Sequence, residues 1–187
     1  DALVRAFDDA LEQLRAAKAI IIDMRGNGGG DDAVAERCAG RFFKSTAAFP
    51  SFQMRMVTLG VPWFAPRMSR SVSPRGPWQY TGPVVLLIDE FVVSSAEHFA
   101  AGMHDSGRAT TVGHTTAGSS GNPVPLEVSG FRFQVSRWRE YRADGSLIEG
   151  HGVPADIAVR PTVADLANGV DRVLAAAIDY LDHLASR

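Results

Sequence analysis

The sequence predicts an α/β fold with a parallel sheet, and three observations lead to this prediction. Two short runs, 19–22 and 84–88, are apolar throughout and rich in β-branched residues, as strands covered on both faces are. Each run is followed, after a short loop, by a helical pattern. The length of 187 residues and the hydrophobic content of 45% suit one domain with a sizeable core. We therefore expect residues 1–187 to form one compact domain.

The first elements should follow the order helix, strand, loop, helix. Residues 3–14 place apolar side chains at helical spacing and acidic ones on other faces, which predicts an amphipathic helix. The strand at 19–22 ends in a glycine-rich loop. Asp31 and Asp32 then open a second helix, because carboxylates suit the free N–H groups of a first turn. This helix should run to about Phe43.

The middle of the chain repeats the unit after a less regular stretch. Residues 44–82 carry five prolines and several arginines, and a strand at 54–59, within a hairpin or flap, is the regular element that we expect there. Residues 83–89 have the composition of a second buried strand. The helical pattern at 95–103 begins a few residues after that strand. The strand-turn-helix unit therefore occurs twice.

The C-terminal half adds a third strand, a hairpin and a closing helix. The third strand is expected at 110–113. Alternating apolar and polar residues in 124–128 and 131–138, around a Ser-Gly pair, predict a β-hairpin. One apolar stripe runs along residues 163–185, which predicts a single closing helix.

Charge and run length exclude two classes of partner. Nineteen basic and 21 acidic residues give a formal net charge of −2 and are spread along the chain, so no basic tract is available to neutralise phosphates. We expect no nucleic-acid partner. The apolar runs are far shorter than the roughly 20 residues needed to cross a bilayer, and the N-terminus lacks the layout of a signal peptide. We expect no membrane span.

Cysteine usage bounds the chemistry further. Cys38 is the one cysteine, so no internal disulfide can form, and no Cys/His cluster has the spacing of zinc ligands. We expect no metal and no organic cofactor. The chain starts at Asp1 without Met and runs directly into a helical pattern, from which we expect a C-terminal part of something longer.

A glycine-rich loop follows the first strand at 23–30, where the sequence is Asp-Met-Arg-Gly-Asn-Gly-Gly-Gly. Glycines at the end of a buried strand let the backbone adopt positive φ and bring N–H groups close to a ligand. Such a loop can hold a phosphate, stabilise an oxyanion or turn the chain. The spacing matches neither the dinucleotide fingerprint nor the P-loop, which removes the phosphate interpretation.

Ser94-Ser95-Ala96-Glu97 occupies the junction between the second strand and its helix. A side chain there can be exposed at a strand's end while the N–H groups of the helix point at an anion, as a nucleophile requires. Serines are also favoured N-caps, and Glu97, three residues after Ser94, completes a capping box. Taken alone, the motif favours capping.

Together, the motifs resemble the serine peptidases that include the C-terminal-processing proteases, the tricorn core and interphotoreceptor retinoid-binding protein. The resemblance rests on the glycine loop, the apolar strand before Asp89, the Ser-Ser-Ala-Glu motif, and the sequence Gly-Arg-Ala-x-x-Val-Gly at 107–113 followed by Thr-Ala-Gly at 116–118. Gly-Val-Pro-Ala-Asp at 152–156 is similar to the family's late motif with one residue rearranged. The resemblance implies the α/β core shared with crotonase and Clp-type proteins, here with an added hairpin and a C-terminal helix.

Carried over residue by residue, the resemblance implies that Ser94 is the nucleophile. The backbone N–H of Ser95 would form half of an oxyanion hole. The other half would come from Gly29, with Gly28 as the second choice. Two N–H donors aimed at a developing alkoxide are what acyl transfer needs.

The general base is where this sequence departs from the processing proteases, which use a lysine. No lysine occurs anywhere in 109–152, so a Ser–Lys dyad is excluded. The tricorn-like branch uses a His oriented by a late Glu, and Glu149 matches that Glu. In that branch the His lies upstream of the first helix. We therefore expect the base to precede Asp1 and residues 1–187 alone to be inactive.

The five histidines of the chain are the remaining internal candidates for the base. His98 shares a helix face with Ser94 but should point along the helix, and His151 could stand at the rim of the site. We expect solvated or structural roles for all of them, including the three others, His104, His114 and His183.

The function implied by the resemblance is peptide-bond hydrolysis through an acyl-enzyme, with unfolded or C-terminal polypeptide segments as substrates and an oligomer as an option. The family favours the periplasm or cell envelope, with the cytoplasm open. An alternative is a module of the same fold that binds an apolar ligand or a partner without chemistry, supported by the missing base and by a set of aromatic residues. Those aromatics are Trp63, Phe64, Trp78, Phe131, Phe133 and Trp138. We expect them to pack in the core and hairpin. Acyl-thioester chemistry of the crotonase type fits the serine motif poorly.

Overall fold

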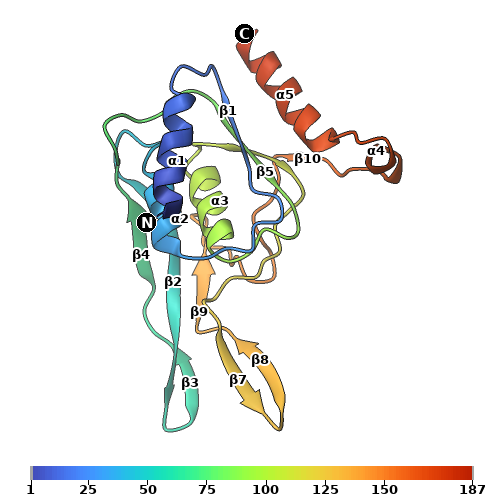
Figure 1. Cartoon of the computed structure of the whole chain (residues 1–187). Helices are drawn as coiled ribbons and strands as arrows, with labels where there is room; N and C mark the ends of the chain where they lie inside the picture. Colours follow the sequence, from blue (N-terminus) through green and yellow to red (C-terminus); the bar gives the residue numbers. More distant parts are fainter. Residues whose placement is uncertain (1, 187) are drawn as a thin grey trace.

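A four-stranded parallel sheet is the centre of the computed structural model, which describes residues 2–186 (Figure 1). Its strands stand in the order β1 (Ile20–Asp23), β5 (Val84–Ile88), β6 (Thr110–Gly113) and β10 (Ile157–Ala158). The helices are α1 (Ala2–Gln13), α2 (Asp32–Ala39), α3 (Ser95–Asp105), α4 (Val163–Ala167) and α5 (Arg172–Ala185). The predicted α/β fold with a parallel sheet is confirmed.

Strand β5 is buried on both faces, as its apolar run predicts. Val84, Leu86 and Ile88 pack into a core shared with α1, α2 and α3. Val85 and Leu87 point to the opposite face, into a smaller core that contains Val173 and Ala177 of α5. Alternate residues of one strand therefore hold two layers of helices on the two faces of the sheet.

The stretch 44–82 is more regular than expected. It forms β2 (Ala47–Thr58), β3 (Val61–Phe64) and β4 (Met68–Val72), and β2 pairs antiparallel with both of the others and with β9 (Trp138–Tyr141). The predicted strand at 54–59 is thus the outer half of a longer strand. Pro62 stands in β3, at the edge of this small sheet, where a missing N–H is tolerated. Pro50 lies within β2, and there the pairing with β4 shifts register between Phe49 and Phe52.

The predicted hairpin is present, with one correction. It consists of β7 (Val124–Val128) and β8 (Phe131–Val135), but the run 131–138 is not one strand. The N–H groups of Arg137 and Trp138 donate to Gly121 O, at 2.8 and 3.3 Å, and Trp138 begins β9. The chain leaves the hairpin at this point and joins β2.

Two helix predictions are also corrected. The closing helix 163–185 is two helices, because Gly169 adopts φ +67° and Asp171 then caps α5 by accepting from Leu174 N at 3.0 Å. The second helix ends at Ala39 instead of Phe43.

Within residues 2–186, no helix has the length and apolar content to span a membrane.

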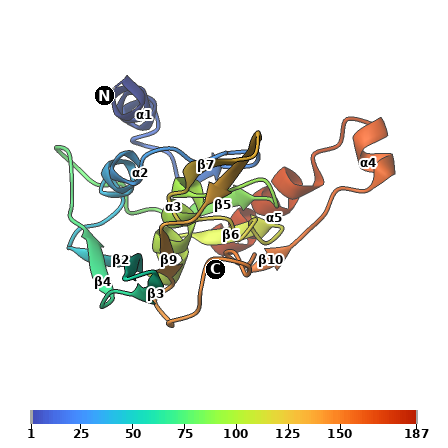
Figure 2. The ribbon, with the colours of Figure 1, turned by 90° about the horizontal axis from the view of Figure 1, so that it is seen from below.

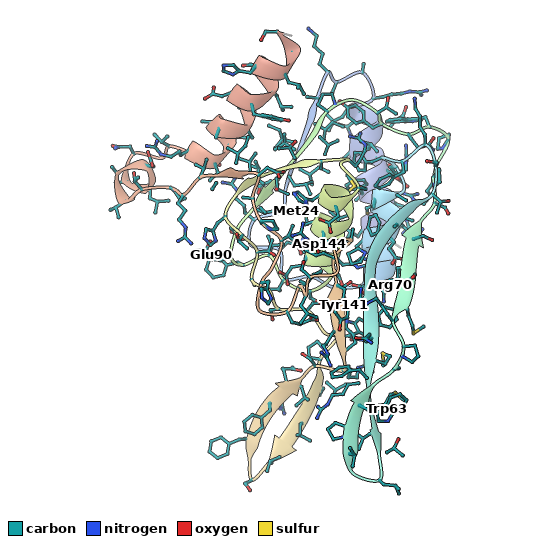
Figure 3. All side chains as sticks on the ribbon, turned by 180° about the vertical axis from the view of Figure 1, so that it is seen from behind. Met24, Trp63, Arg70, Glu90, Tyr141 and Asp144 are labelled. Atoms are coloured by element: carbon teal, nitrogen blue, oxygen red, sulfur yellow. The ribbon has the colours of Figure 1, made fainter. Side chains whose placement is uncertain are left out.

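Two β arms project from the same end of the core. The outer part of β2 with β3 forms one arm, and β7 with β8 forms the other (Figure 1). Seen from below, β2 and β3 lie on the side of α3 away from α5, whereas the β7–β8 arm crosses in front of α3 (Figure 2). Trp63 lies out on the first arm, whereas Arg70 and Tyr141 lie where the arm joins the core (Figure 3). The candidate site lies where β4 and the base of the β7–β8 arm meet the core.

Candidate active site

Ser94 lies at the turn between β5 and α3, in a backbone conformation that serine rarely adopts. Its φ is +57° and its ψ is −129°, whereas an ordinary N-cap residue has extended backbone. Such conformations cost about 1–3 kcal/mol and persist only where the surroundings enforce them. Strain of this kind at a serine between a strand and a helix is typical of a positioned nucleophile.

The glycine loop packs directly against this turn. A Cβ on Gly29 would lie 2.7 Å from Ser94 Cβ and 2.7 Å from Val93 O, and the φ of Gly29 is +84°. The N–H of Val93 also donates to Asn27 O at 3.0 Å. Close approach and positive φ both require glycine at position 29. The structure thus brings together the two motifs that the sequence singled out.

The Ser95 and Gly29 amides, which were predicted to bind an oxyanion, lie on either side of the contact between the glycine loop and the Ser94 turn. Ser95 is the first residue of α3, and the same Cβ on Gly29 would lie 3.0 Å from its backbone N. The Gly29 N–H, however, donates to Asn27 Oδ1 at 3.0 Å. A Cβ on Gly28 would meet nothing within 4 Å, so that residue borders open space.

A cleft of about 790 Å³ opens above Ser94. The glycine loop, α2, β4 and the base of the β7–β8 arm form its walls. Its lining residues are Gly28, Gly30, Asp31, Asp32, Ala33, Glu36, Arg70, Ser71, Ser94, Ser95, Ser120, Asn122, Pro123 and Trp138. None of these lining residues is a histidine or a lysine, the side chains that would serve as a base here.

The buried carboxylate of Glu97 holds the Ser94 turn to a second loop. It accepts hydrogen bonds from Thr116 Oγ1 at 2.5 Å, Gly118 N at 2.7 Å and Ser119 N at 2.8 Å. A weaker bond comes from Ser94 N at 3.3 Å. Burial raises the pKa of Glu97, and these donors oppose that effect. The capping interaction expected from the sequence is therefore one contact of a larger clamp.

Glu149 is attached to the same loop but is not among the residues that line the cleft. Gly150 N donates to Gly118 O at 2.8 Å, which fastens the residue after Glu149 to the segment held by Glu97. Both carboxylate oxygens of Glu149 accept from Glu140 N, each at 3.0 Å. Burial raises the pKa of Glu149, and the nearby Glu140 and Glu97 carboxylates add to the increase.

His98 is fully buried one turn along α3 from Ser94 and is bonded through both ring nitrogens. Its Nδ1 lies 2.5 Å from Glu140 Oε1 and its Nε2 lies 3.1 Å from Glu36 Oε1. Burial opposes protonation, but these two bonds outweigh it and raise the pKa of His98 to about 9. His98 therefore has a structural role, as the sequence argument expected, and both of its ring nitrogens are occupied, so neither is free to act as a base.

Sequence reasoning did not find the residues around His98. Glu140 also accepts from Ser120 Oγ at 2.6 Å, and Asp32 pairs with Arg70 Nη1 at 2.6 Å. Asp32 and Glu36 are four residues apart on α2, which places them on one helix face, and that spacing was the available signal. Nothing in the sequence pairs them with Glu140 or with His98.

Asp32, His98 and Glu140 offer ligand atoms within 4.8 Å of one another, a separation that a metal ion could bridge. The hydrogen bonds to Glu36, Arg70 and Ser120 already satisfy these groups. A metal would have to displace the proton of His98 and break these hydrogen bonds. The three residues therefore form an ion network.

The other histidines lie elsewhere or at the surface. His104 pairs with Asp105 and Asp156 at the far end of α3, and His183 lies on α5. His114 contacts Arg160. His151 is exposed, with Nδ1 3.1 Å from Glu149 O.

Comparison with known proteins places this parallel α/β core, with its Ser94 turn beside a glycine loop, among the peptidases. More closely, the chain belongs to peptidase family S41, whose sequence model matches residues 3–159. The family resemblance noted from the motifs is confirmed.

Solved structures share the fold. A putative peptidase from Parabacteroides merdae superposes with a TM-score of 0.83 at 24% identity, covering 95% of this chain and 56% of that one. Mature CPAF in complex with lactacystin gives a TM-score of 0.83 at 17% identity, covering 98% and 47%. The photosystem II D1 C-terminal processing protease gives 0.63 at 21% identity, covering 84% and 38%.

A curated protein also matches in sequence. The Chlamydia pneumoniae protein CPj1016/CpB1054 is 35% identical over 99 residues, which is 51% of this chain and 16% of that protein. The chain therefore spans about half of the first two structures, 38% of the third, and 16% of this curated relative.

Replacing the clamp carboxylate should destabilise the whole fold. In Glu97→Gln an amide NH₂ would face donors that need an acceptor, so we expect the free energy of unfolding to fall by about 2–4 kcal/mol. Urea denaturation followed by circular dichroism measures this change. Glu127→Gln, on the exposed β7 strand, is the matched control and should stay within about 0.5 kcal/mol of the parent. Equal effects of the two substitutions would contradict the clamp.

The His98 network should make stability decrease with rising pH. A histidine has a pKa of about 6.5 when unfolded, and about 9 here, so its contribution is fully present below about pH 6.5 and is lost as the pH rises through about 9. The pKa difference of about 2.5 units, at about 1.4 kcal/mol per unit, predicts a loss of roughly 3 kcal/mol across this window, which His98→Gln removes. Urea melts at several pH values measure it, with His183→Gln as the control. Parallel pH profiles for the parent and His98→Gln would refute the charged role.

Proposed function

We propose that this domain hydrolyses peptide bonds through an acyl-enzyme formed on Ser94. The observation that carries the proposal is the contact of Gly29 with the strained Ser94 turn, beside the first N–H of α3. Family membership supports the same chemistry. A module that only binds ligands would have no need of the strained serine conformation.

In the proposed reaction, Ser94 Oγ attacks the substrate carbonyl and loses its proton to a base. The carbonyl oxygen becomes an oxyanion that the N–H of Ser95 and an N–H of the glycine loop receive, each worth about 3–4 kcal/mol of barrier. The Gly29 N–H, which donates to Asn27 Oδ1 in this structure, would donate to the oxyanion instead. Gly28 is the second candidate, since it borders the cleft. The tetrahedral intermediate then collapses, the peptide C–N bond breaks, and the amine leaves with the proton that the base returns. Water, activated by the same base, then hydrolyses the ester and releases the acyl group from Ser94.

The general base in this proposal is a histidine from outside residues 1–187. The lining of the cleft holds no histidine or lysine, and His98 uses both nitrogens in its network. Glu149 would accept a hydrogen bond from the N–H on the far side of the incoming imidazole, which fixes the orientation of the ring. Its attachment to Glu140 N holds the carboxylate in place for that role.

The proposed substrates are polypeptides in extended, unfolded form. The cleft of about 790 Å³ is open and reaches the base of the β7–β8 arm at Asn122 and Pro123, which suits an extended chain more than a compact ligand. One similar structure is named for processing a C-terminus, so we include C-terminal segments among the proposed substrates. No nucleic acid enters the proposal, because the cleft carries three carboxylates against one arginine.

A fluorophosphonate probe tests the nucleophile. In the longer natural protein we expect an adduct on Ser94, located by peptide mass mapping, and no adduct in Ser94→Ala. Gly29→Ala should lose labelling because its methyl would overlap Ser94 Cβ and Val93 O. Gly28→Ala adds its methyl to open space and should lose far less. An active natural protein with no adduct on Ser94 would exclude the acyl-enzyme and favour another mechanism.

Residues 1–187 alone should hydrolyse casein negligibly. Serine is a weak nucleophile without a base, and loss of a triad member costs on the order of 10⁴–10⁶ in turnover. The longer natural protein should be faster by several orders of magnitude, and Ser94→Ala should abolish this gain. Ordinary turnover by residues 1–187 that disappears in His151→Ala or His98→Ala would place the base inside this chain.

A further inference from the structure

The β7–β8 arm has one wholly apolar face that the described chain leaves uncovered. Directly opposite residues of an antiparallel pair share a face, and three such pairs here are apolar. The pairs are Val124 with Val135, Leu126 with Phe133, and Val128 with Phe131. The other face carries Glu127, Arg132 and Gln134. Phe131 is 69% exposed and Phe133 is 50% exposed.

This exposure corrects the expectation that both phenylalanines pack within the fold. An isolated two-stranded hairpin is marginally stable, and every β7 residue is exposed. A contiguous apolar face on such an arm marks an interaction site.

The backbone pattern shows which edge of the arm can accept another strand. Ser129 and Gly130 both have positive φ, 51° and 80°, which is the two-residue turn whose flanking pair is hydrogen-bonded. Counting from that pair, residues 125 and 127 of β7 and residues 132 and 134 of β8 direct their backbone groups outward. Pro125 has no N–H, which blunts the β7 edge. The β8 edge keeps the N–H and C=O of Arg132 and Gln134.

The arm is continuous with the catalytic cleft at its base. Asn122 and Pro123, just before β7, line the cleft, and so does Trp138, just after β8. A strand added along β8 would therefore lead into the cleft. Its alternate side chains would lie beside Phe131 and Phe133 on the apolar face.

We propose that the β7–β8 arm is a docking site for an apolar, extended stretch of the unfolded polypeptide substrate, which adds as a strand along β8. The proposal rests on the proposed peptidase function and names the segment that the enzyme holds outside the scissile bond. Main-chain hydrogen bonds to β8 supply affinity, and the apolar face selects segments in which apolar residues alternate with others.

Binding can be tested apart from catalysis in residues 1–187 carrying Ser94→Ala. The probe is fluorescein-labelled, reduced and carboxymethylated α-lactalbumin, an unfolded chain, and the readout is fluorescence anisotropy. Phe131→Ser with Phe133→Ser should weaken binding by about tenfold or more, because two large apolar contacts are lost. Arg132→Ser with Gln134→Ser, on the polar face, is the matched control and should change the affinity by less than about twofold.

A backbone variant tests the strand addition itself. Gln134→Pro removes an outward N–H from β8 and leaves the bonds to β7 intact, so it should also weaken binding several-fold. Thermal melts should show that all of these variants retain the parent's folded core, since the arm lies outside it.

Three outcomes would overturn the proposal. One is no binding by the parent, and another is equal binding by the Phe131→Ser/Phe133→Ser variant and its control. The third is a parent that sediments as a dimer which this variant disrupts, without polypeptide binding, because the apolar face would then pair two copies of the chain. Fluorophosphonate labelling of Ser94 does not involve the arm, so the proposed function can stand or fall separately.

Discussion

The arrangement of the site depends on one buried carboxylate, that of Glu97. Removing a carboxylate from water costs several kcal/mol unless its oxygens receive strong hydrogen bonds, so the surrounding groups must adopt positions that supply them. Thr116 and the amides of Gly118 and Ser119 do this, with Ser94 N as a weaker donor. The requirement fixes the loop, and the loop in turn fixes the segment that carries Glu149. Glu97 has this effect without needing to touch a substrate.

A second buried network determines the spacing of the cleft walls. His98 joins α3 to α2 through Glu36 and to β9 through Glu140. Because β9 pairs with β2, the same contacts connect the serine-bearing helix to the base of the arms. The parallel sheet supplies the strand ends, but these ionic contacts hold the walls around Ser94 at a fixed distance. The Glu97 contacts position the Ser94 turn, and the His98 contacts position the walls of the cleft, so both networks are needed.

Local patterns in the sequence predicted the features that depend on residues close together in the chain, such as buried strands and tight turns. The apolar runs located β1 and β5, and the motif spacing located Ser94 and Gly29, which the structure brings into contact. The helix break at Gly169 was missed because the apolar stripe continues across it, whereas a single positive φ ends a helix. The pairing of His98 with Glu140 joins residues far apart in sequence, and no local signal specifies it. Alternation predicted the β7–β8 hairpin but could not show that its apolar face is uncovered.

The alternating burial of β5 divides the molecule into two cooperative units. The larger core holds α1, α2 and α3, whereas α5 contacts the sheet through the smaller cluster around Val173 and Ala177. Local opening free energies follow the apolar area that an element buries, so the α5 layer can detach transiently while the other layer stays folded. Amide hydrogens of α5 would then exchange by this partial opening, and those of α3 by global unfolding. The fold thereby separates the layer that fluctuates from the layer that carries Ser94.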